Sequence, residues 1–367
     1  MKTTQVVIVG GGPAGLCAAI EAAKAGAQAV IIDENARPGG QLFKQIHKFF
    51  GSFEHRAGVR GYAIGAELLE EAGRLGVEVI LDAPVYGLFR HESGMMVSYT
   101  QGGREKAILG EKLILATGAS ENALAFPGGT LPGVMGAGCA QTMVNINRVL
   151  PGKKIVMVGS GNVGLIVAYQ LLQAGAGVSA LIEASSCIGG YGVHASKIRR
   201  SGTPILLGHT VTRAIGTSQV EAVEIARLDE DFRPLAGTER VLEADTICVA
   251  VGLSPLTELA WMAGCDFTWI PQLGGHVPIH NENMETTVSG VYAAGDITGS
   301  EEASTAMEEG RLAGIAVAES LGLAGGKTKE MKLEVWERMN ALRTGPFGQR
   351  RLEAKAHLLG SARRVPQ

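Results

Sequence analysis

The sequence has few cysteines and almost no excess of charge. Its five cysteines are scattered, odd in number and never spaced as C-x-x-C, so they support neither a disulfide framework nor a metal or iron–sulfur site. The net charge of −3 gives no electrostatic reason to expect binding to nucleic acid or to an anionic membrane. Scattered thiols suit a reducing compartment, and the first apolar run leads into a glycine motif instead of a signal cleavage site. We therefore expect a cytoplasmic protein.

One long run without charged residues has the length of a transmembrane segment, but its other residues argue against that interpretation. Residues 155–182 contain no charged side chain, and a helix of about 20 apolar residues is enough to cross a bilayer. Gly159, Gly161 and Gly164 interrupt this run near its start, however, and Gln170 is polar. We therefore predict no transmembrane segment.

What the sequence does contain is a glycine motif between two short apolar runs. Gly10, Gly12 and Gly15 follow residues 6–9, a helical run comes next, and the second apolar run closes on Asp33. In the dinucleotide-binding fingerprint the first glycine permits a tight turn, the second lets the backbone approach a diphosphate, and the third lets helix pack on strand. The helix N-terminus attracts the diphosphate, and the acid is placed to bind a ribose hydroxyl.

The same arrangement occurs a second time. Gly159, Gly161 and Gly164 lie between apolar runs, and Glu183 ends the second run. Two copies of one unit predict two bound dinucleotides. A glutamate at this place would bind the 2′-hydroxyl of NAD and repel a 2′-phosphate, and residues 184–186 include no arginine to bind that phosphate. The sequence therefore favours NAD over NADP.

Three other segments are candidates for contact with a cofactor. The glycine pair before Gln41, in residues 37–41, would let backbone pass close to a phosphate or a flavin, a plain surface turn being the alternative. Residues 112–118 and 246–252 are matching apolar strands that end in small residues. In residues 287–299 a strand ends at Gly295 and Asp296, where the acid could bind a polyhydroxyl chain and the following helix could face a flavin carbonyl.

The ordered set GGGPAG, RPGGQ, ILATG, GSGNVG, CVAVG and GVYAAGD resembles the two-dinucleotide-binding-domain flavoproteins of the pyridine nucleotide-disulfide oxidoreductase superfamily. The resemblance implies an α/β fold like that of glutathione and thioredoxin reductases, with two Rossmann-like ββα domains. The expected FAD domain comprises residues 1–122 and 280–325, and the NAD domain, residues 150–279, is inserted. Residues 123–149 are an expected crossover, and residues 326–367 an expected tail that either docks a partner or is a solvated helix.

The resemblance also assigns cofactor contacts, and it assigns neither a catalytic side chain nor a metal ligand. The expected FAD contacts are Gly10, Gly12, Pro13, Ala14, Gly15, Asp33, Glu34, Gly40, Gln41, Val85, Ala116, Thr117, Gly118, Gly295 and Asp296. The expected NAD(H) contacts are Gly159, Gly161, Asn162, Gly164 and Glu183, and Gly252 is a further cofactor-binding candidate.

The sequence departs from those members of the superfamily that reduce disulfides. The segment after Gly40, where one type carries two cysteines, has none, and Cys139 stands alone with Thr142 where another type has its second cysteine. A dithiol relay needs two thiols within reach of each other, so we do not expect disulfide reduction. We expect Cys139 to be a buried packing residue, because free cysteines are commonly buried.

The strings LPGVMGAGCAQTMV and LRTGPFG resemble subunits of heteromeric amine and amino-acid dehydrogenases, the group of hydrogen cyanide synthase, opine oxidase and proline or hydroxyproline dehydrogenase. This implies an FAD-dependent oxidoreductase that passes electrons between flavin and NAD(H) beside a separate FAD-dependent amine or amino-acid dehydrogenase subunit. A small [2Fe-2S] protein is a further implied partner, and any cluster would lie on another chain. The alternatives are a self-contained NADH:acceptor oxidoreductase and a subunit whose second nucleotide is structural.

Overall fold

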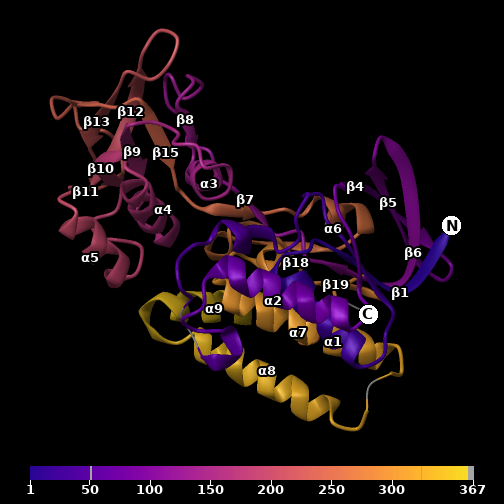
Figure 1. Ribbon diagram of the computed structural model, residues 1–367. Coiled ribbons are helices and arrows are strands. Elements are labelled where there is room, and N and C mark those ends of the chain that lie inside the picture. Colours follow the sequence, from indigo (N-terminus) through magenta and orange to yellow (C-terminus); the bar gives the residue numbers. More distant parts are fainter. Residues whose placement is uncertain (50–51, 324, 363–367) are drawn as a thin grey trace. The chain divides into compact units, whose positions relative to one another are not determined.

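The computed structural model describes residues 1–49, 52–323 and 325–362, so that the end of the expected tail, residues 363–367, lies outside the described residues. The chain divides into two compact units (Figure 1). Unit 1 comprises Met1–Ser120 and Ser254–Gln367, and unit 2 comprises Glu121–Leu253. Two short strands, β7 (Ala119–Glu121) and β16 (Leu253–Pro255), pair with each other where the chain passes between the units.

These boundaries differ from the expected ones at both ends of the inserted segment. The expected crossover belongs to unit 2, because it supplies the strand β8 (Val134–Gly136), which pairs with the sheet of that unit. The segment after residue 254 belongs to unit 1, because helix α6 (Glu258–Ala263) buries Leu259 and Ala260 in the core of that unit. The compact second unit is therefore residues 121–253, whereas the sequence suggested 150–279.

Unit 1 is built on a seven-stranded sheet in the order β3-β2-β1-β6-β5-β4, with β19 also paired to β6. Strands β3, β2, β1, β6 and β19 are parallel, and β6, β5 and β4 form an antiparallel meander. The strands are β1 (Lys2–Val9), β2 (Ala29–Ile32), β3 (Glu78–Ile80), β4 (Val85–His91), β5 (Gly94–Gln101), β6 (Arg104–Leu115) and β19 (Val291–Ala293). The predicted strands at residues 6–9 and 29–32 are confirmed.

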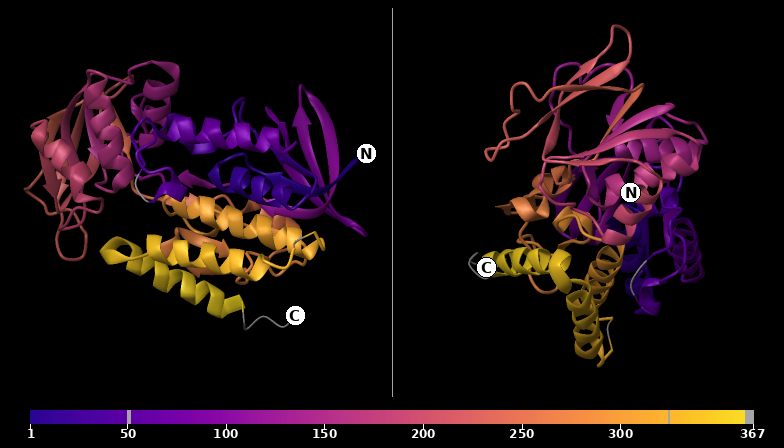
Figure 2. Two further views of the ribbon diagram at one scale, coloured as in Figure 1. Left: turned by 60° about the horizontal axis from the view of Figure 1, so that its bottom comes forward. Right: turned by 90° about the vertical axis from the view of Figure 1, so that its left-hand side faces the viewer.

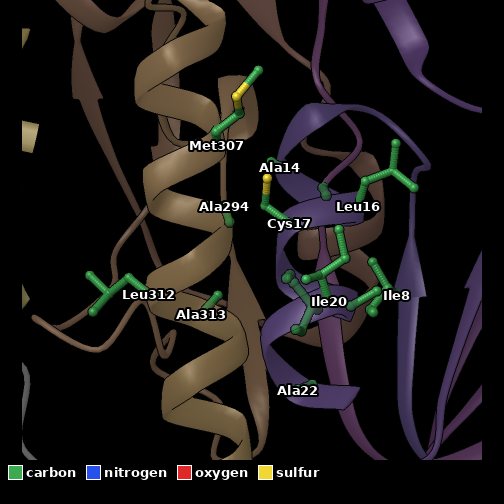
Figure 3. Close-up of a cluster of buried hydrophobic side chains, with 14 of the residues drawn as sticks. Ile8, Ala14, Leu16, Cys17, Ile20, Ala22, Ala294, Met307, Leu312 and Ala313 are labelled. Carbon is green, nitrogen blue, oxygen red and sulfur yellow. The ribbon is translucent and has the colours of Figure 1, made fainter. Parts of the chain in front are cut away.

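Helix α1, which follows the first glycine motif, packs closely against another helix of unit 1. Helix α7 lies against α1, since a Cβ at Gly310 would be 2.1 Å from the Ala14 carbonyl oxygen and one at Gly314 2.3 Å from that of Ala18. Figure 3 shows the buried apolar side chains of this contact, Cys17 and Ala313 among them. The helices are α1 (Pro13–Lys24), α2 (Gly61–Arg74), α6, α7 (Ala303–Ser320), α8 (Thr328–Leu342) and α9 (Gly345–Ala362), and a small sheet pairs β17 (Phe267–Ile270) with β18 (Gly275–Pro278).

Unit 2 has a five-stranded parallel sheet in the order β11-β10-β9-β15-β8, and a separate three-stranded antiparallel sheet. The parallel strands besides β8 are β9 (Lys154–Val158), β10 (Gly177–Glu183), β11 (Ile205–Leu207) and β15 (Thr246–Val249). The antiparallel strands are β12 (His209–Ile215), β13 (Ala222–Arg227) and β14 (Arg240–Glu243), and the helices are α3 (Ala137–Thr142), α4 (Asn162–Gln173) and α5 (Gly192–Arg200).

The uncharged run at residues 155–182 forms a strand, a helix and a strand of this unit, β9, α4 and β10. Across the described ranges of the chain, no helix is both long enough and apolar enough to cross a membrane. A π-helical turn, Met143–Asn147, continues α3.

Candidate nucleotide-binding sites

The first glycine turn, Gly10–Gly15, connects β1 to α1, and its three motif glycines serve different purposes. Gly10 has φ +104°, and a Cβ there would lie 2.2 Å from the Ala116 carbonyl oxygen; a Cβ at Gly15 would lie 1.9 Å from the Gly10 carbonyl oxygen. The fold itself requires glycine at these two positions. Gly12 is different, because the nearest heavy atom to its Cβ position is the Gly40 Cα at 4.0 Å. The Cβ direction of Gly12 therefore points into space that a ligand can occupy.

The N-terminus of α1 is suited to an anion. Gly12 is its N-cap, no side chain caps its first turn, and no acidic residue lies in that turn. Pro13 and Ala14, two expected contacts, are its first residues. Because helix N-termini present N–H groups and a positive dipole end, this arrangement fits a diphosphate.

Asp33 lies at the end of β2, and its buried carboxylate contacts the first glycine turn. Its Oδ2 accepts a hydrogen bond from the Gly11 N–H at 2.6 Å, and its Oδ1 accepts from the Asn35 N–H at 2.8 Å and from Asn35 Nδ2 at 2.9 Å. A carboxylate has about four acceptor positions, so Asp33 keeps capacity for a further donor such as a ribose hydroxyl. The next residue, Glu34, is exposed.

The glycine pair at residues 39–40 packs directly on the first glycine turn. The Gly39 N–H donates to the Gly11 carbonyl oxygen at 2.5 Å. Gly40 has φ +52°, and a Cβ there would lie 2.9 Å from the Gly12 Cα. The pair therefore packs on the first glycine turn, and its contact with a phosphate or a flavin stays a prediction. Gln41 follows it and is exposed.

The other contacts expected in the first half of unit 1 lie at the ends of two strands of its sheet. Ala116, Thr117 and Gly118 come directly after β6; the Ala116 carbonyl oxygen faces Gly10, and Thr117 Oγ1 donates to the Leu256 carbonyl oxygen at 2.6 Å. Val85 begins β4 and is half-buried. The chain just before Val85 is held beside Asp33, the expected ribose contact, because the Ala83 N–H donates to the Asp33 carbonyl oxygen at 3.0 Å.

The second glycine turn, Gly159–Gly164 in unit 2, repeats the geometry of the first. Gly159 has φ +102°, and its Cβ would lie 2.2 Å from the Ala250 carbonyl oxygen; a Cβ at Gly164 would lie 2.1 Å from the Gly159 carbonyl oxygen. A Cβ at Gly161 would meet nothing within 4 Å. Helix α4 likewise has neither a side-chain cap nor an acid in its first turn. The second turn therefore also presents an open helix N-terminus to an anion.

Glu183 corresponds to Asp33 in this second unit. Its Oε2 accepts hydrogen bonds from the Ser160 N–H at 2.8 Å and from Ser160 Oγ at 2.6 Å, and its Oε1 accepts from the Ser185 N–H at 2.8 Å. Like Asp33, it accepts three hydrogen bonds and keeps room for one more donor. Gly252, the further candidate, follows β15 with φ +113°.

A glycine pair also packs on the second glycine turn, and the sequence reasoning missed it. The Gly189 N–H donates to Ser160 Oγ at 3.0 Å, and a Cβ at Gly190 would lie 2.9 Å from the Asn162 backbone nitrogen. Asn162, an expected NAD(H) contact, holds this segment because its Oδ1 accepts from the Tyr191 N–H at 2.8 Å.

A signal for this second pair was present in the sequence. The pair at residues 39–40 follows Asp33 at the same spacing at which the pair at residues 189–190 follows Glu183. An alignment of the two repeats over their full length would have pointed to the glycine pair at residues 189–190 and to Ser160, whose side chain binds it.

The Gly295–Thr298 turn follows β19 and lies against the start of α1. A Cβ at Gly295, which has φ +80°, would be 2.8 Å from the Ala14 Cβ. The turn is held by a buried carboxylate on α7, because Glu309 Oε2 accepts from the Gly295 N–H at 3.0 Å and from Thr298 Oγ1 at 2.7 Å. Asp296 is thereby placed next to the first glycine turn, as the sequence predicts for a residue that binds the same cofactor.

Burial, together with the charges of Glu309 and Glu301, raises the pKa of the half-buried Asp296 to about 7. The Glu301 N–H and the charge of Lys355 act in the opposite direction. The carboxyl group of the cofactor-free protein is therefore largely protonated in mildly acidic solution.

We expect the contribution of Asp296 to the free energy of unfolding of the cofactor-free protein to fall as the pH rises from about 4 to about 7. In that range the folded state keeps the Asp296 proton, whereas the unfolded state, with a pKa near 3.8, has lost it, so raising the pH favours unfolding. Urea titrations of the wild type and of Asp296→Asn would measure this contribution, which the variant lacks. At pH 8 the variant should be the more stable protein and yet bind FAD roughly tenfold more weakly, the effect of one lost hydrogen bond to a charged acceptor. Equal pH dependence in the two proteins would contradict the raised pKa.

No two of the five cysteines form a disulfide. All five are free thiols, and Cys139, which we expected to be buried, is exposed. That expectation was wrong because α3 directs position 139 away from the core into which its neighbours Gly138 and Ala140 are packed. Burial raises the pKa of Cys17 to about 11 and that of Cys248 to about 12. These two buried thiols therefore remain protonated at neutral pH, which makes them poor nucleophiles.

Several known proteins are similar to this chain over most of its length. One subunit of the opine oxidase of Agrobacterium tumefaciens is 28% identical over 355 residues, which cover 90% of this chain and 68% of that protein. The corresponding opine oxidase subunit of Rhizobium meliloti is 31% identical, with 87% and 63% covered. Hydrogen cyanide synthase subunit HcnB of Pseudomonas aeruginosa is 30% identical, with 85% and 70% covered. The chain thus spans only part of the length of these relatives.

Two solved structures share the fold. The thioredoxin reductase of T. acidophilum aligns with a TM-score of 0.72 at 21% identity, over 88% of this chain and 99% of that one. The L-proline dehydrogenase of P. horikoshii aligns with a TM-score of 0.70 at 22% identity, over 91% of this chain and 59% of that one. The predicted α/β fold of the thioredoxin reductase type is confirmed.

Residues 4–310 match the family described as pyridine nucleotide-disulphide oxidoreductase. The predicted membership of this family is therefore confirmed, and the two glycine turns fit the two cofactors that it implies. The chain belongs to the pyridine nucleotide-disulphide oxidoreductase family, whose members are oxidoreductases that bind FAD and NAD(P).

Proposed function

We propose that this chain binds FAD in unit 1 and NAD(H) in unit 2 and passes electrons between them, as one subunit of a heteromeric amine or amino-acid dehydrogenase. When bound, the two cofactors supply the hydride-transfer chemistry, and the protein supplies binding and orientation. The observation that carries the proposal is the repetition of one site. Each glycine turn leaves the Cβ direction of its middle glycine open, at a helix N-terminus beside a fixed carboxylate.

The Gly295–Thr298 turn supports placing FAD in unit 1. It brings Asp296 beside the first turn of α1, so that one extended ligand could contact Gly12 with its diphosphate and Asp296 with a polyhydroxyl chain. A carboxylate that accepts hydrogen bonds from hydroxyl groups suits the ribityl part of a flavin cofactor. This leaves the second glycine turn for the nicotinamide dinucleotide.

The surroundings of Glu183 support NAD over NADP. The carboxylate is fixed by Ser160 and Ser185 at the end of β10, where the fingerprint places the adenosine ribose. A fixed negative charge there accepts a hydrogen bond from the 2′-hydroxyl and repels a 2′-phosphate.

The relatives support a heteromeric enzyme, because those named above are subunits of opine oxidase and hydrogen cyanide synthase. We propose that a separate FAD-dependent amine or amino-acid dehydrogenase subunit oxidises the substrate, and that a small [2Fe-2S] protein can join the complex. The free and scattered cysteines of this chain give no cluster site of their own. They suit a reducing cytoplasm, where we expect the complex to work.

The test is to purify the full chain, alone and with its co-purifying subunits, and to titrate it anaerobically with NADH and NADPH. We expect a yellow protein whose flavin absorbance is bleached by NADH at far lower concentrations than by NADPH. A colourless chain that FAD cannot reconstitute would contradict the proposal. A yellow chain that NADH never bleaches would instead support a structural nucleotide in unit 2. Rapid oxidation of NADH by the lone chain with oxygen or a dye would support a self-contained oxidoreductase.

A further inference from the structure

Three carboxylates lie buried on α7 and just before it, and cations of the C-terminal segment pair with each of them, Glu308 being paired with Arg311 of α7 as well. Glu301, Glu308 and Glu309 are each less than a tenth exposed. Figure 2 shows α8 and α9 beside α7 within unit 1. Arg338 on α8 pairs with Glu308, Arg343 after α8 pairs with Glu301 and Glu309, and Lys355 on α9 pairs with Glu309. Because an unpaired buried charge is costly, the tail is an integral part of unit 1.

Glu309 joins this tail to the turn beside α1. Its Oε2 accepts the two hydrogen bonds from Gly295 and Thr298 described above. Its Oε1 accepts from Arg343 Nη2 at 2.9 Å and from Lys355 Nζ at 2.8 Å. A single carboxylate thus connects the turn that carries Asp296 to both C-terminal helices.

Lys355 also contacts the turn itself. Its Nζ donates to the Thr298 carbonyl oxygen at 3.0 Å and to Thr298 Oγ1 at 2.6 Å, in addition to Glu309. All three ammonium hydrogens therefore have acceptors. The Arg343 guanidinium binds both oxygens of Glu301, at 3.0 Å from Nε and 2.8 Å from Nη2. Charge-assisted and bidentate hydrogen bonds of this kind fix the positions of the paired groups as well as balancing their charges.

The network also sets the charge around Asp296. Burial alone would raise the pKa of Glu309, but the charges of Lys355 and Arg343 and the Lys355 hydrogen bond lower it overall. Glu309 is therefore ionised and balanced by these cations. Loss of either cation would leave excess negative charge beside the turn.

We propose that Arg343 and Lys355 are positioning residues of the FAD site, which act through Glu309 to hold the Gly295–Thr298 turn against α1 and to balance the charge beside Asp296. This inference rests on the proposed binding of FAD in unit 1. It gives the segment after residue 326 a role in the cofactor site, whereas the sequence suggested a docking tail or a solvated helix.

The test compares Lys355→Met with Arg350→Gln in the full chain. Arg350 lies on the same helix but is exposed, so it is a matched control. For each apoprotein we would measure the FAD dissociation constant by flavin fluorescence, the midpoint potential of the bound flavin, and the unfolding temperature with and without FAD. We expect Lys355→Met to raise the FAD dissociation constant at least about tenfold, which is a common size for the energetic coupling between two sites. We also expect a more negative midpoint potential, because loss of a nearby positive charge disfavours the electron-rich reduced flavin. In the control Arg350→Gln neither the FAD dissociation constant nor the midpoint potential should change.

A second set of variants separates positioning from general destabilisation. In the double variant Glu309→Gln/Lys355→Met the charges of Arg343 and Glu301 balance each other again, so part of the lost FAD affinity should return. If Lys355→Met does not fold, Arg343→Lys and Lys355→Arg carry the same measurements. Wild-type FAD affinity and potential in the folded variants, or an equal loss of unfolding temperature with and without FAD, would overturn the inference. A wild type that binds no FAD would instead show failure of the proposed function itself.

Discussion

Gly12→Ala should weaken FAD binding roughly 10- to 100-fold in a protein that still folds, and Gly161→Ala should do the same to NAD(H) binding alone. Gly12 has φ −75° and ψ −174°, and Gly161 has φ −63° and ψ 174°, which alanine adopts freely. The added methyl group meets no protein atom closer than 4 Å at either place. The free energy of unfolding should therefore change by less than about 0.5–1 kcal/mol. A bound diphosphate would have to share the same space.

Overpacking of this kind costs about 1–3 kcal/mol, so each dissociation constant should rise roughly 10- to 100-fold. Flavin absorbance after gel filtration and NADH binding to the flavin-loaded protein measure the two effects separately. The controls are Gly10→Ala and Gly15→Ala, in which the new Cβ would lie 2.2 and 1.9 Å from a backbone oxygen. These should destabilise the protein whether or not a cofactor is present. If Gly12→Ala kept wild-type FAD affinity, the first glycine turn would not hold the diphosphate.

The glycine turns could be predicted from the sequence because their geometry depends on nearby residues. The spacing of Gly10, Gly12 and Gly15 between two apolar runs is enough to specify a strand, a turn and a helix. The carboxylate of Asp33 then comes within 2.6 Å of the turn through the pairing of two adjacent parallel strands. The repeat at Gly159 follows the same rules, and this explains why both glycine turns could be located from the sequence.

The parts that could not be predicted depend on contacts between residues far apart in the chain. Lys355 reaches Thr298 across 57 positions and Glu309 across 46, and no local pattern marks a lysine of an ordinary amphipathic helix as buried. A solvated helix was the reasonable expectation for such a charged segment. The exposure of Cys139 likewise depends on how a short helix is oriented, and cysteine composition alone favours burial.

The tail provides the other large expected effect. A chain that ends at Gly325 should be insoluble or should unfold on the order of 10 °C below the full chain. The truncation removes Arg338, Arg343 and Lys355, and breaking a buried ion pair costs about 3–5 kcal/mol, a large part of an ordinary stability of about 5–15 kcal/mol. It also uncovers apolar surface, since Val335 and Met339 are buried in the core around α1.

This result separates the two roles open to residues 326–362. If the tail only docked a partner, the truncated chain would keep its unfolding temperature and its FAD and would lose only the associated subunit. If the tail completes unit 1, stability and FAD are lost together, whether or not a partner is present. Differential scanning fluorimetry with and without FAD distinguishes these outcomes, and Lys329→Gln, at an exposed position of the same tail, provides the control for a simple loss of surface charge. Because the buried carboxylates of α7 have these cations as partners, we expect the second outcome.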